Sequence, residues 1–157
     1  MHSSEHSRQS NACVMLIDDN DGLRHLLNLA LESAGFEVIQ AGTHFEVQRH
    51  LAQCRPDAVV INLQRSEADG LDLLTRMRAR QNLINVPILF LSGTDDQRLR
   101  WQAAKAGADW FGLRPLGMVE LQNRVAELIR GGRRPAQSRS RQKPPGPPQV
   151  LPLRRTG

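Results

Sequence analysis

Several residue types that mark particular protein classes are scarce in this chain. It has no tyrosine, aromatic residues make up 4% of its 157 residues, and its only cysteines are Cys13 and Cys54. Two cysteines are too few for the disulfide framework of a small secreted domain, and we expect two ordinary buried or half-buried thiols. The five histidines lack the paired spacing of zinc sites. Disulfide-scaffold and zinc-finger classes are therefore excluded.

Long hydrophobic runs are also missing. No apolar stretch approaches the roughly 20 residues of a membrane-spanning helix. The first seven residues contain no apolar signal region. A hydrophobic content of 39% suffices for one core. We therefore predict a cytoplasmic protein without membrane insertion, with one domain and a tail.

The net charge of +5 is divided unevenly along the chain. Residues 131–157 hold seven of the 21 basic residues and none of the 16 acids, so the rest of the chain holds 14 basic residues against 16 acids. This segment also carries six prolines and could not form a core. We expect residues 1–11 to be a disordered lead, 12–130 a domain, and 131–157 a disordered basic tail. The basic tail includes Arg133, Arg134, Arg139, Arg141 and Lys143.

The tail has three open interpretations. It is a solvated linker, a polybasic arm for nucleic acid or another acidic surface, or a proline-rich ligand for a partner domain. It has no aromatic residue for stacking on bases. No helix-turn-helix follows residue 130, which argues against sequence-specific DNA binding, whereas non-specific nucleic-acid contact by the tail stays open.

Strand and helix patterns alternate from residue 12 onward. Apolar runs of strand length are followed by segments with apolar residues at helical spacing. This alternation predicts an α/β fold with a single five-stranded parallel, doubly wound sheet and five helices. The expected strands are 13–17, 36–40, 57–62, 86–91 and 109–113, and the expected helices are 22–34, 44–53, 70–80, 95–106 and 117–130. The second strand alternates and should form an edge, and Asp95 is expected to cap the fourth helix.

Polar side chains end or follow four of the predicted strands. In parallel sheets the carboxyl ends of the strands meet at one edge, where polar sites gather. We therefore expect one cluster there, composed of Asp18, Asp19, Asn62, Ser92 and Arg114.

Residues 12–130 resemble the receiver domain of bacterial response regulators, a flavodoxin-like fold. The landmarks that carry the resemblance occur in family order and at family spacing. They are Asp18-Asp19, Pro56-Asp57, Asp69-Gly70, Leu91-Ser92, Gly107-Ala108-Asp109 and Pro115. The resemblance implies that the acid pair holds Mg²⁺ and that an aspartate at position 62 accepts a phosphoryl group. It also implies that a hydroxyl at 92 and a lysine at 114 contact that group, and that the bond before Pro115 is cis.

This chain departs from that pattern at two central positions. Asn62 stands where the resemblance implies the nucleophilic aspartate, and Arg114 replaces the lysine. A side-chain amide is neutral and a poor nucleophile, unlike a carboxylate. We therefore predict a degenerate phosphorylation pocket with no catalytic residue and no required cofactor. Asp18 and Asp19 would bind Mg²⁺ weakly or not at all. Our hypothesis is that Arg114 pairs with Asp18 or Asp19 and partly substitutes for the cation.

Aromatic and basic residues gather where receivers usually contact their partners. The predicted signalling face comprises Arg100, Trp101, Trp110 and Phe111, residue types that often anchor interfaces. For Trp101 a core position is favoured over a contact position, whereas Trp110 is compatible with either. Phe111 occupies the family's aromatic switch position.

The leading hypothesis is a non-enzymatic, phosphorylation-independent receiver that acts as a protein–protein interaction module in two-component-type signalling. Its partners would be proteins such as a histidine kinase, with a homodimer left open. One alternative is a conventional phosphorelay receiver with residual phosphorylation displaced to Ser92 or Asp57. The other is a nucleic-acid-associated protein that acts through its basic tail.

Overall fold

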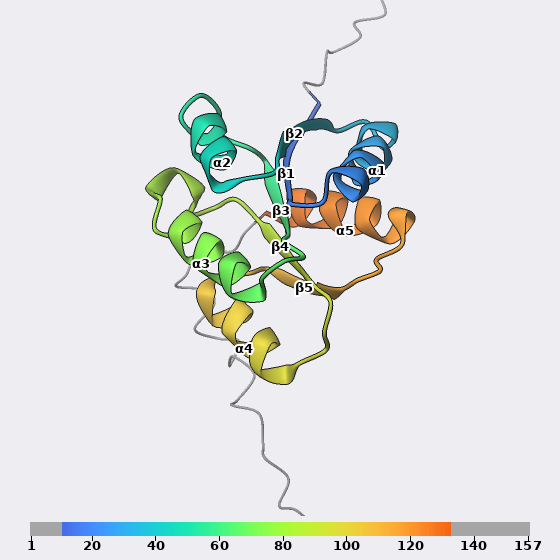
Figure 1. The fold of residues 1–157 in the computed structure, drawn as a ribbon. Helices are drawn as coiled ribbons and strands as arrows, with labels where there is room; N and C mark the ends of the chain where they lie inside the picture. The colour runs from blue at the N-terminus through green and yellow to red at the C-terminus, as the bar shows by residue number, and fades with distance from the viewer. Residues whose placement is uncertain (1–10, 133–157) are drawn as a thin grey trace, which may run out of the picture.

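Five parallel strands alternate with five α-helices in residues 11–132, the part of the chain that this computed structural model describes (Figure 1). The strands are β1 (Cys13–Asp18), β2 (Glu37–Ala41), β3 (Ala58–Asn62), β4 (Ile88–Ser92) and β5 (Trp110–Leu113). The helices are α1 (Asp21–Ser33), α2 (His44–Leu51), α3 (Glu67–Arg78), α4 (Gln97–Ala106) and α5 (Met118–Gly131), with a 3₁₀ turn at Gln81–Leu83. The predicted fold class is confirmed.

The predictions for the two ends of the chain fall largely outside the described residues. Residues 1–10 and 133–157 lie there, and with them all five tail residues named above. Gly131, which the sequence assigns to the tail, instead ends α5. Within residues 11–132, no helix is both long enough and apolar enough to cross a membrane.

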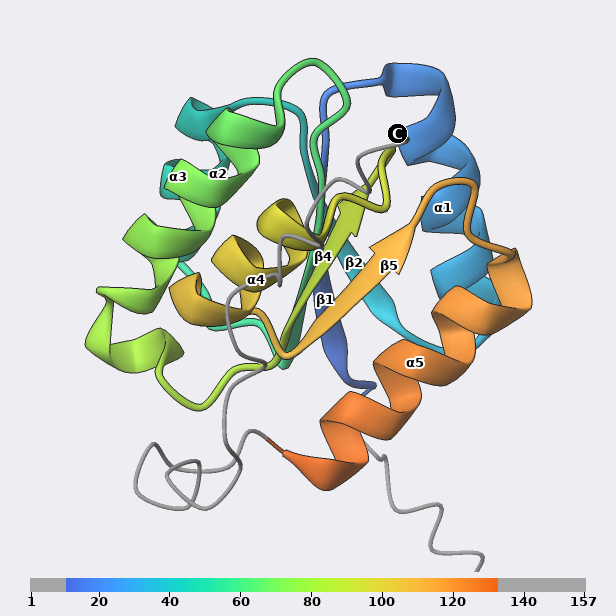
Figure 2. The ribbon, with the colours of Figure 1, turned by 90° about the horizontal axis from the view of Figure 1, so that it is seen from below.

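The sheet is covered by helices on both faces. Its strand order is β2-β1-β3-β4-β5, and each neighbouring pair is parallel. Helices α1 and α5 cover one face, while α2, α3 and α4 cover the other (Figure 2). β1, β3 and β4 are buried along nearly their whole length, as their continuous apolar runs predict. β2 lies at an edge, as its alternating pattern predicts.

Helix α3 begins three residues earlier than the sequence pattern indicates. The Ser66 hydroxyl accepts a hydrogen bond from the Asp69 backbone N–H at 3.2 Å and caps the helix. Gly70 then lies inside the first turns of α3 rather than at its start. A Cβ there would sit 3.0 Å from the Phe90 ring, so the glycine permits close packing of α3 on β4. The earlier start places Glu67 in the first turn.

The cap of α4 also differs from the prediction. Asp96, not Asp95, precedes the helix, and its carboxylate accepts a hydrogen bond from the Arg98 backbone N–H at 2.8 Å. Asp95 instead forms an exposed ion pair with Arg100 at 2.8 Å. The two aspartates are adjacent, and only the backbone path decides which of them reaches the free N–H groups of the first turn.

At the amino end of the sheet, Arg78 joins three segments. Its guanidinium donates to the carbonyl oxygens of Leu83, Val86 and Gly107 and to the Asp109 carboxylate at 2.6 Å. That carboxylate also accepts the Ile88 backbone N–H. Both charged side chains are only 9% exposed. This buried network holds the starts of β4 and β5 together, at the opposite end of the strands from the predicted cluster.

Candidate functional site

The structure brings the five predicted cluster residues to one end of the sheet. Asp18 and Asn62 are paired in the register of β1 and β3, and Ser92 ends β4. Asp19 follows Asp18, and Arg114 follows β5. We call this group (Asp18, Asp19, Asn62, Ser92 and Arg114) the strand-end site. Because the strands are parallel and in register, residues that lie far apart in sequence meet there.

Asp18 is fully buried within the strand-end site. Its carboxylate accepts the Asn20 backbone N–H at 2.9 Å and the Asn62 amide N–H at 2.9 Å. Burial raises the pKa of Asp18 above its ordinary value, and Asp19 adds to the increase, while the two hydrogen bonds and Arg24 oppose it. The buried carboxylate therefore depends on donors that are supplied by its neighbours.

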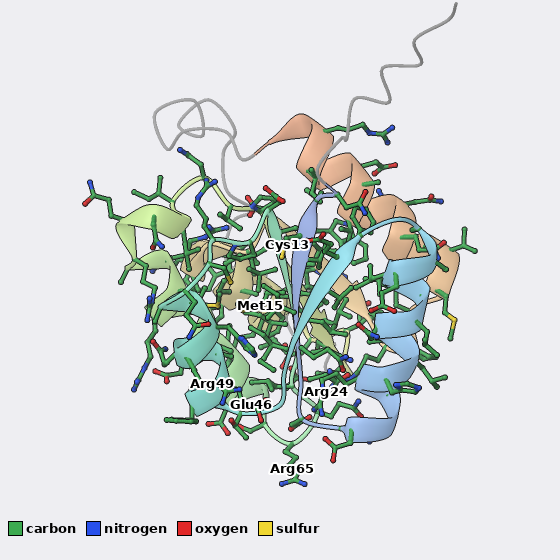
Figure 3. All side chains as sticks on the ribbon, turned by 90° about the horizontal axis from the view of Figure 1, so that it is seen from above. Cys13, Met15, Arg24, Glu46, Arg49 and Arg65 are labelled. Carbon is green, nitrogen blue, oxygen red and sulfur yellow. The ribbon has the colours of Figure 1, made fainter. Side chains whose placement is uncertain are left out.

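Asp19 fastens two loops together. Its two carboxylate oxygens accept the backbone N–H groups of Gln64 and Arg65 at 2.9 and 3.0 Å. The loop after β3 is thereby tied to the loop after β1. Arg65 itself is exposed, and its side chain points away from the molecule (Figure 3). The backbone at position 65, and not its side chain, contributes to the site.

Asn62 and Arg114 are joined directly. The Arg114 guanidinium donates to the Asn62 amide oxygen at 2.8 Å and to the Leu91 carbonyl oxygen at 3.2 Å. The hypothesis that Arg114 pairs with Asp18 or Asp19 is not what the structure shows. The Asn62 amide lies between the arginine and Asp18, offering its oxygen to one and its N–H to the other. The bond between Arg114 and Pro115 is cis, as the resemblance implied.

Glu67 belongs to the site, although the sequence analysis missed it. One of its oxygens, Oε1, lies 2.9 Å from the Ser92 hydroxyl, 3.1 Å from the Gly93 backbone nitrogen and 3.4 Å from Arg114 Nη2. The available signal was Ser66 followed three residues later by Asp69, the spacing of a helix cap that opens α3 at residue 67. Placing that helix start at residue 70 left Glu67 in a loop.

The donor set at the strand-end site does not fit Mg²⁺. Hard cations prefer several carboxylate or carbonyl oxygens, but here an amide N–H of Asn62 points at Asp18, and both oxygens of Asp19 accept backbone N–H groups. Among the described residues, no group of three or more histidine, cysteine, aspartate or glutamate side chains is arranged to hold a metal ion.

The two candidates for displaced phosphorylation are poorly placed for it. Asp57 precedes β3 at the amino end of the sheet, where its carboxylate accepts the Cys13 backbone N–H at 2.7 Å. It therefore lies at the opposite end of the strand from Asn62. Ser92 is in the site, but it is fully buried and its hydroxyl is hydrogen-bonded to Glu67 and Thr94.

The strand-end site opens on an apolar pocket of about 340 Å³. Asn62 and Arg114 form part of its lining. The other lining residues are Leu23, Leu27, Gln64, Leu91, Pro115 and Leu116. The pocket therefore lies between α1 and the connection from β5 to α5.

The predicted signalling face carries three contacts between a cation and an aromatic ring. Arg100 lies 5.0 Å from the Phe111 ring centre, Lys105 lies 4.8 Å from that of Trp101, and Arg124 lies 5.4 Å from that of Trp110. These rings are half-buried, and Phe111 stacks on buried Phe90 with ring centres 5.9 Å apart. Phe111 and Trp110 thus pack against the core, and a cation lies over each of the three rings.

Comparison with known proteins identifies the family. The model of the response regulator receiver domain matches residues 14–126, and the chain therefore belongs to this family, a class of signalling domains. The receiver domain of the Francisella response regulator 1452 is a similar solved structure. The two structures superpose with a TM-score of 0.69 and 27% sequence identity. The alignment covers 77% of this chain and 98% of the Francisella domain.

The curated relatives are transcriptional regulators that are longer than this chain. The transcriptional regulatory protein PrrA of Mycobacterium tuberculosis is 34% identical over 143 residues, which cover 90% of this chain and 60% of PrrA. The DNA-binding dual master transcriptional regulator RpaA of Synechocystis is 28% identical and covers 74% and 48%, respectively. The chain thus spans about half to three-fifths of the length of these relatives.

These relatives correct one prediction. Sequence-specific DNA binding was not expected from the sequence, because no helix-turn-helix pattern follows residue 130. That inference is wrong, because the relatives that this chain matches are transcriptional regulators, and one of them is named as DNA-binding. The chain covers only 60% and 48% of the length of these two relatives, so the sequence pattern after residue 130 is no argument against action on DNA.

Proposed function

We propose that this chain is a phosphorylation-independent receiver that acts as a protein–protein interaction module in two-component-type signalling. The carrying observation is the position of the Asn62 amide. It occupies the end of β3 beside Asp18, where the family resemblance calls for a nucleophilic carboxylate. Its oxygen is held by Arg114 and its N–H is held by Asp18, so the amide serves as a structural bridge.

The surroundings of Asn62 support this proposal. A phosphoryl-accepting aspartate needs a cation to neutralise charge as the group is transferred, and the donor set here does not suit Mg²⁺. Arg114 contacts the neutral amide instead. Asn62 and Arg114 are hydrogen-bonded to each other, and Asp18 and Asp19 accept hydrogen bonds from other groups of the protein. The site is thus a closed hydrogen-bonded network and is not arranged to receive a phosphoryl group.

Acetyl phosphate tests the proposal. The wild-type chain is incubated with acetyl phosphate and Mg²⁺, and its intact mass is then measured. We expect no mass increase, because neither Asn62 nor a displaced side chain is placed to accept the group. A mass gain of one phosphoryl group on the wild-type chain would refute the proposal. A known phosphorylatable receiver, treated in parallel, confirms that the reagent is active.

We also propose that the signalling output is transcriptional. The support is the set of curated relatives, which are transcriptional regulators of which this chain spans a part. Immunoprecipitation of the cross-linked protein from its native cells, followed by sequencing of the recovered DNA, tests this. Enrichment at discrete promoters is expected, whereas a uniform distribution across the genome would remove the assignment.

The surface that would transmit the signal is the predicted signalling face. Arg100, Trp101, Trp110 and Phe111 lie on α4 and β5, and their aromatic rings are covered by exposed or half-buried cations. We propose that partners bind there by displacing these cations from the rings, which makes aromatic surface available for contact.

A further inference from the structure

Three hydrogen-bond donors converge on a single carboxylate oxygen beside the strand-end site. They are the Ser92 hydroxyl, the Gly93 backbone N–H and the Arg114 guanidinium, and all lie within 3.4 Å of Glu67 Oε1. The hydroxyl has one proton, and a charged acceptor at 2.9 Å is a stronger partner than the neutral Thr94 carbonyl at 3.1 Å. A hydroxyl, a backbone N–H and a cation together form an anion-binding cradle.

The donors come from two different strand ends, and the carboxylate comes from a helix. Ser92 and Gly93 lie at the end of β4, Arg114 follows β5, and Glu67 lies in the first turn of α3. Glu67 therefore connects three segments that are far apart in sequence. Its second oxygen is buried and has no hydrogen-bond partner among residues 11–132. Leaving that oxygen unpaired costs free energy, so the three contacts of Oε1 hold the side chain in place.

Helix stabilisation alone does not explain this position. An acid in the first turn interacts favourably with the helix dipole even when it is exposed to solvent. Glu120 in the first turn of α5 is such an exposed acid. Glu67, in contrast, is only 29% exposed and turns into the cradle.

We propose that Glu67 is a built-in anion that permanently fills this cradle. Building on the proposed function, it takes the place that a phosphoryl group would take between Ser92 and Arg114. The carboxylate thereby fixes the loop after β4 and the arginine after β5 in an anion-bound arrangement. Phe111 lies three residues before Arg114, so this arrangement extends toward the signalling face.

Variants at Glu67 test the proposal through the Gly93 amide. Amide NMR spectra are compared for the wild-type chain, Glu67→Gln, Glu67→Ala and Glu120→Gln. We expect the Gly93 amide resonance to move most in Glu67→Ala and less in Glu67→Gln, which keeps a neutral acceptor. Glu120→Gln removes the matched first-turn acid of α5 and should leave Gly93 unchanged. An unmoved Gly93 resonance in Glu67→Ala would overturn the proposal.

Titration with inorganic phosphate provides the second measurement. If Glu67 fills the cradle, removing it exposes three donors. Glu67→Ala should then bind phosphate at least about tenfold more tightly than the wild type, roughly 1.4 kcal/mol, as followed at Gly93. Adding Ser92→Ala to Glu67→Ala should reverse most of this gain. Equal phosphate affinity in the wild type and Glu67→Ala would contradict the proposal, provided that both melt cooperatively.

The two proposals fail in different experiments. A phosphoryl mass gain on the wild-type chain would remove the proposed function. An unmoved Gly93 resonance or unchanged phosphate affinity, without a mass gain, would remove only the role of Glu67.

Discussion

Two arginines hold opposite ends of the same sheet, and their partners differ in kind. Arg78 at the amino end contacts three backbone carbonyls and a carboxylate at 2.6 Å. Arg114 at the carboxyl end contacts a neutral amide, one backbone carbonyl and a carboxylate at 3.4 Å. Their side chains are 9% and 16% exposed.

The contacts of Arg78 serve the fold, whereas those of Arg114 can change without loss of the fold. Arg78 is bound mainly by backbone, which cannot change without unfolding the ends of β4 and β5. The partners of Arg114 include two side chains, Asn62 and Glu67, that can be replaced or moved while the sheet stays intact. The same residue type therefore stabilises the fold at one end and links side chains of the strand-end site at the other.

The largest expected effect comes from breaking the amino-end network. Asp109→Ala leaves the buried Arg78 charge without its carboxylate and should lower the free energy of unfolding by about 3–5 kcal/mol, as measured by urea denaturation. Asp72→Ala, which removes an exposed ion pair with Arg76 at 3.0 Å, is the control and should cost about 0–1 kcal/mol. If Asp109→Ala lowered the free energy of unfolding less than Arg114→Ala does, the amino-end network would not be the more important of the two for stability.

The second effect comes from restoring a carboxylate at the carboxyl end. Asn62→Asp places two carboxylates where Asp18 and the Asn62 amide now lie 2.9 Å apart. Such a pair raises the pKa of one member in the folded state. We expect a loss of about 2–4 kcal/mol at pH 7 without metal, from a shift of roughly 1.5–3 pKa units.

The stability loss of Asn62→Asp depends on pH. Because the folded pKa lies above the unfolded value, the variant is closest to the wild type near pH 4 and loses stability as the pH rises through the folded pKa. Thermal melts from pH 4 to 8 in chelator measure the difference in melting temperature between the wild type and Asn62→Asp. Millimolar Mg²⁺ should stabilise the variant but not the wild type, and so reduce this difference. A difference that stays constant with pH would show that charge repulsion is not the cause.

A smaller effect is expected at Arg114. Arg114→Ala removes donors from the Asn62 amide oxygen and the Leu91 carbonyl, which should cost about 1–2 kcal/mol in urea denaturation. Arg114→Lys keeps the charge but loses the planar fork, so it should recover only part of this loss. Full recovery by lysine would mean that charge alone, and not the forked geometry, holds the site.

The smallest effect concerns Cys13 near the amino ends of the strands. Burial, with Cys54, Asp57 and Glu37 adding to it, raises the pKa of this thiol to about 11. In a Cys54→Ala background, iodoacetamide should therefore alkylate Cys13 slowly at pH 8, with the rate rising toward pH 11. Stability should fall between pH 9 and 11, because the unfolded thiol ionises first. Rapid alkylation at pH 8 would contradict the shielding of this thiol.

Much of the strand-end site could be predicted from the sequence because strand positions follow from local patterns. Asp18 ends an apolar run of β1 and Asn62 ends one of β3, and parallel pairing brings them together. Glu67 was not placed, because its position depends on where α3 begins and the apolar spacing alone was used to set that start. The sequence pattern put that start at Gly70, and the Ser66 cap puts it at Glu67.

The hydrogen-bond partner of Arg114 could not be predicted from local sequence patterns either. The charges of Asp18 and Asp19 attract an arginine in principle. In the structure, however, the Asn62 amide lies between Arg114 and Asp18. Asp19 instead accepts hydrogen bonds from the backbone of the β3–α3 loop. These are consequences of loop geometry, which no periodicity encodes.

The sequence alone determined that this protein is a five-stranded parallel α/β domain of the receiver type, with an amide at the end of β3. Its apolar runs and helical spacings are local properties, and they dictate the order of the elements. Only the tertiary structure decided that the amide bridges Asp18 to Arg114 and that Glu67 fills the cradle of Ser92, Gly93 and Arg114. These contacts join residues up to 52 positions apart in the sequence. Such residues meet only when the strands and helices between them pack into the tertiary structure.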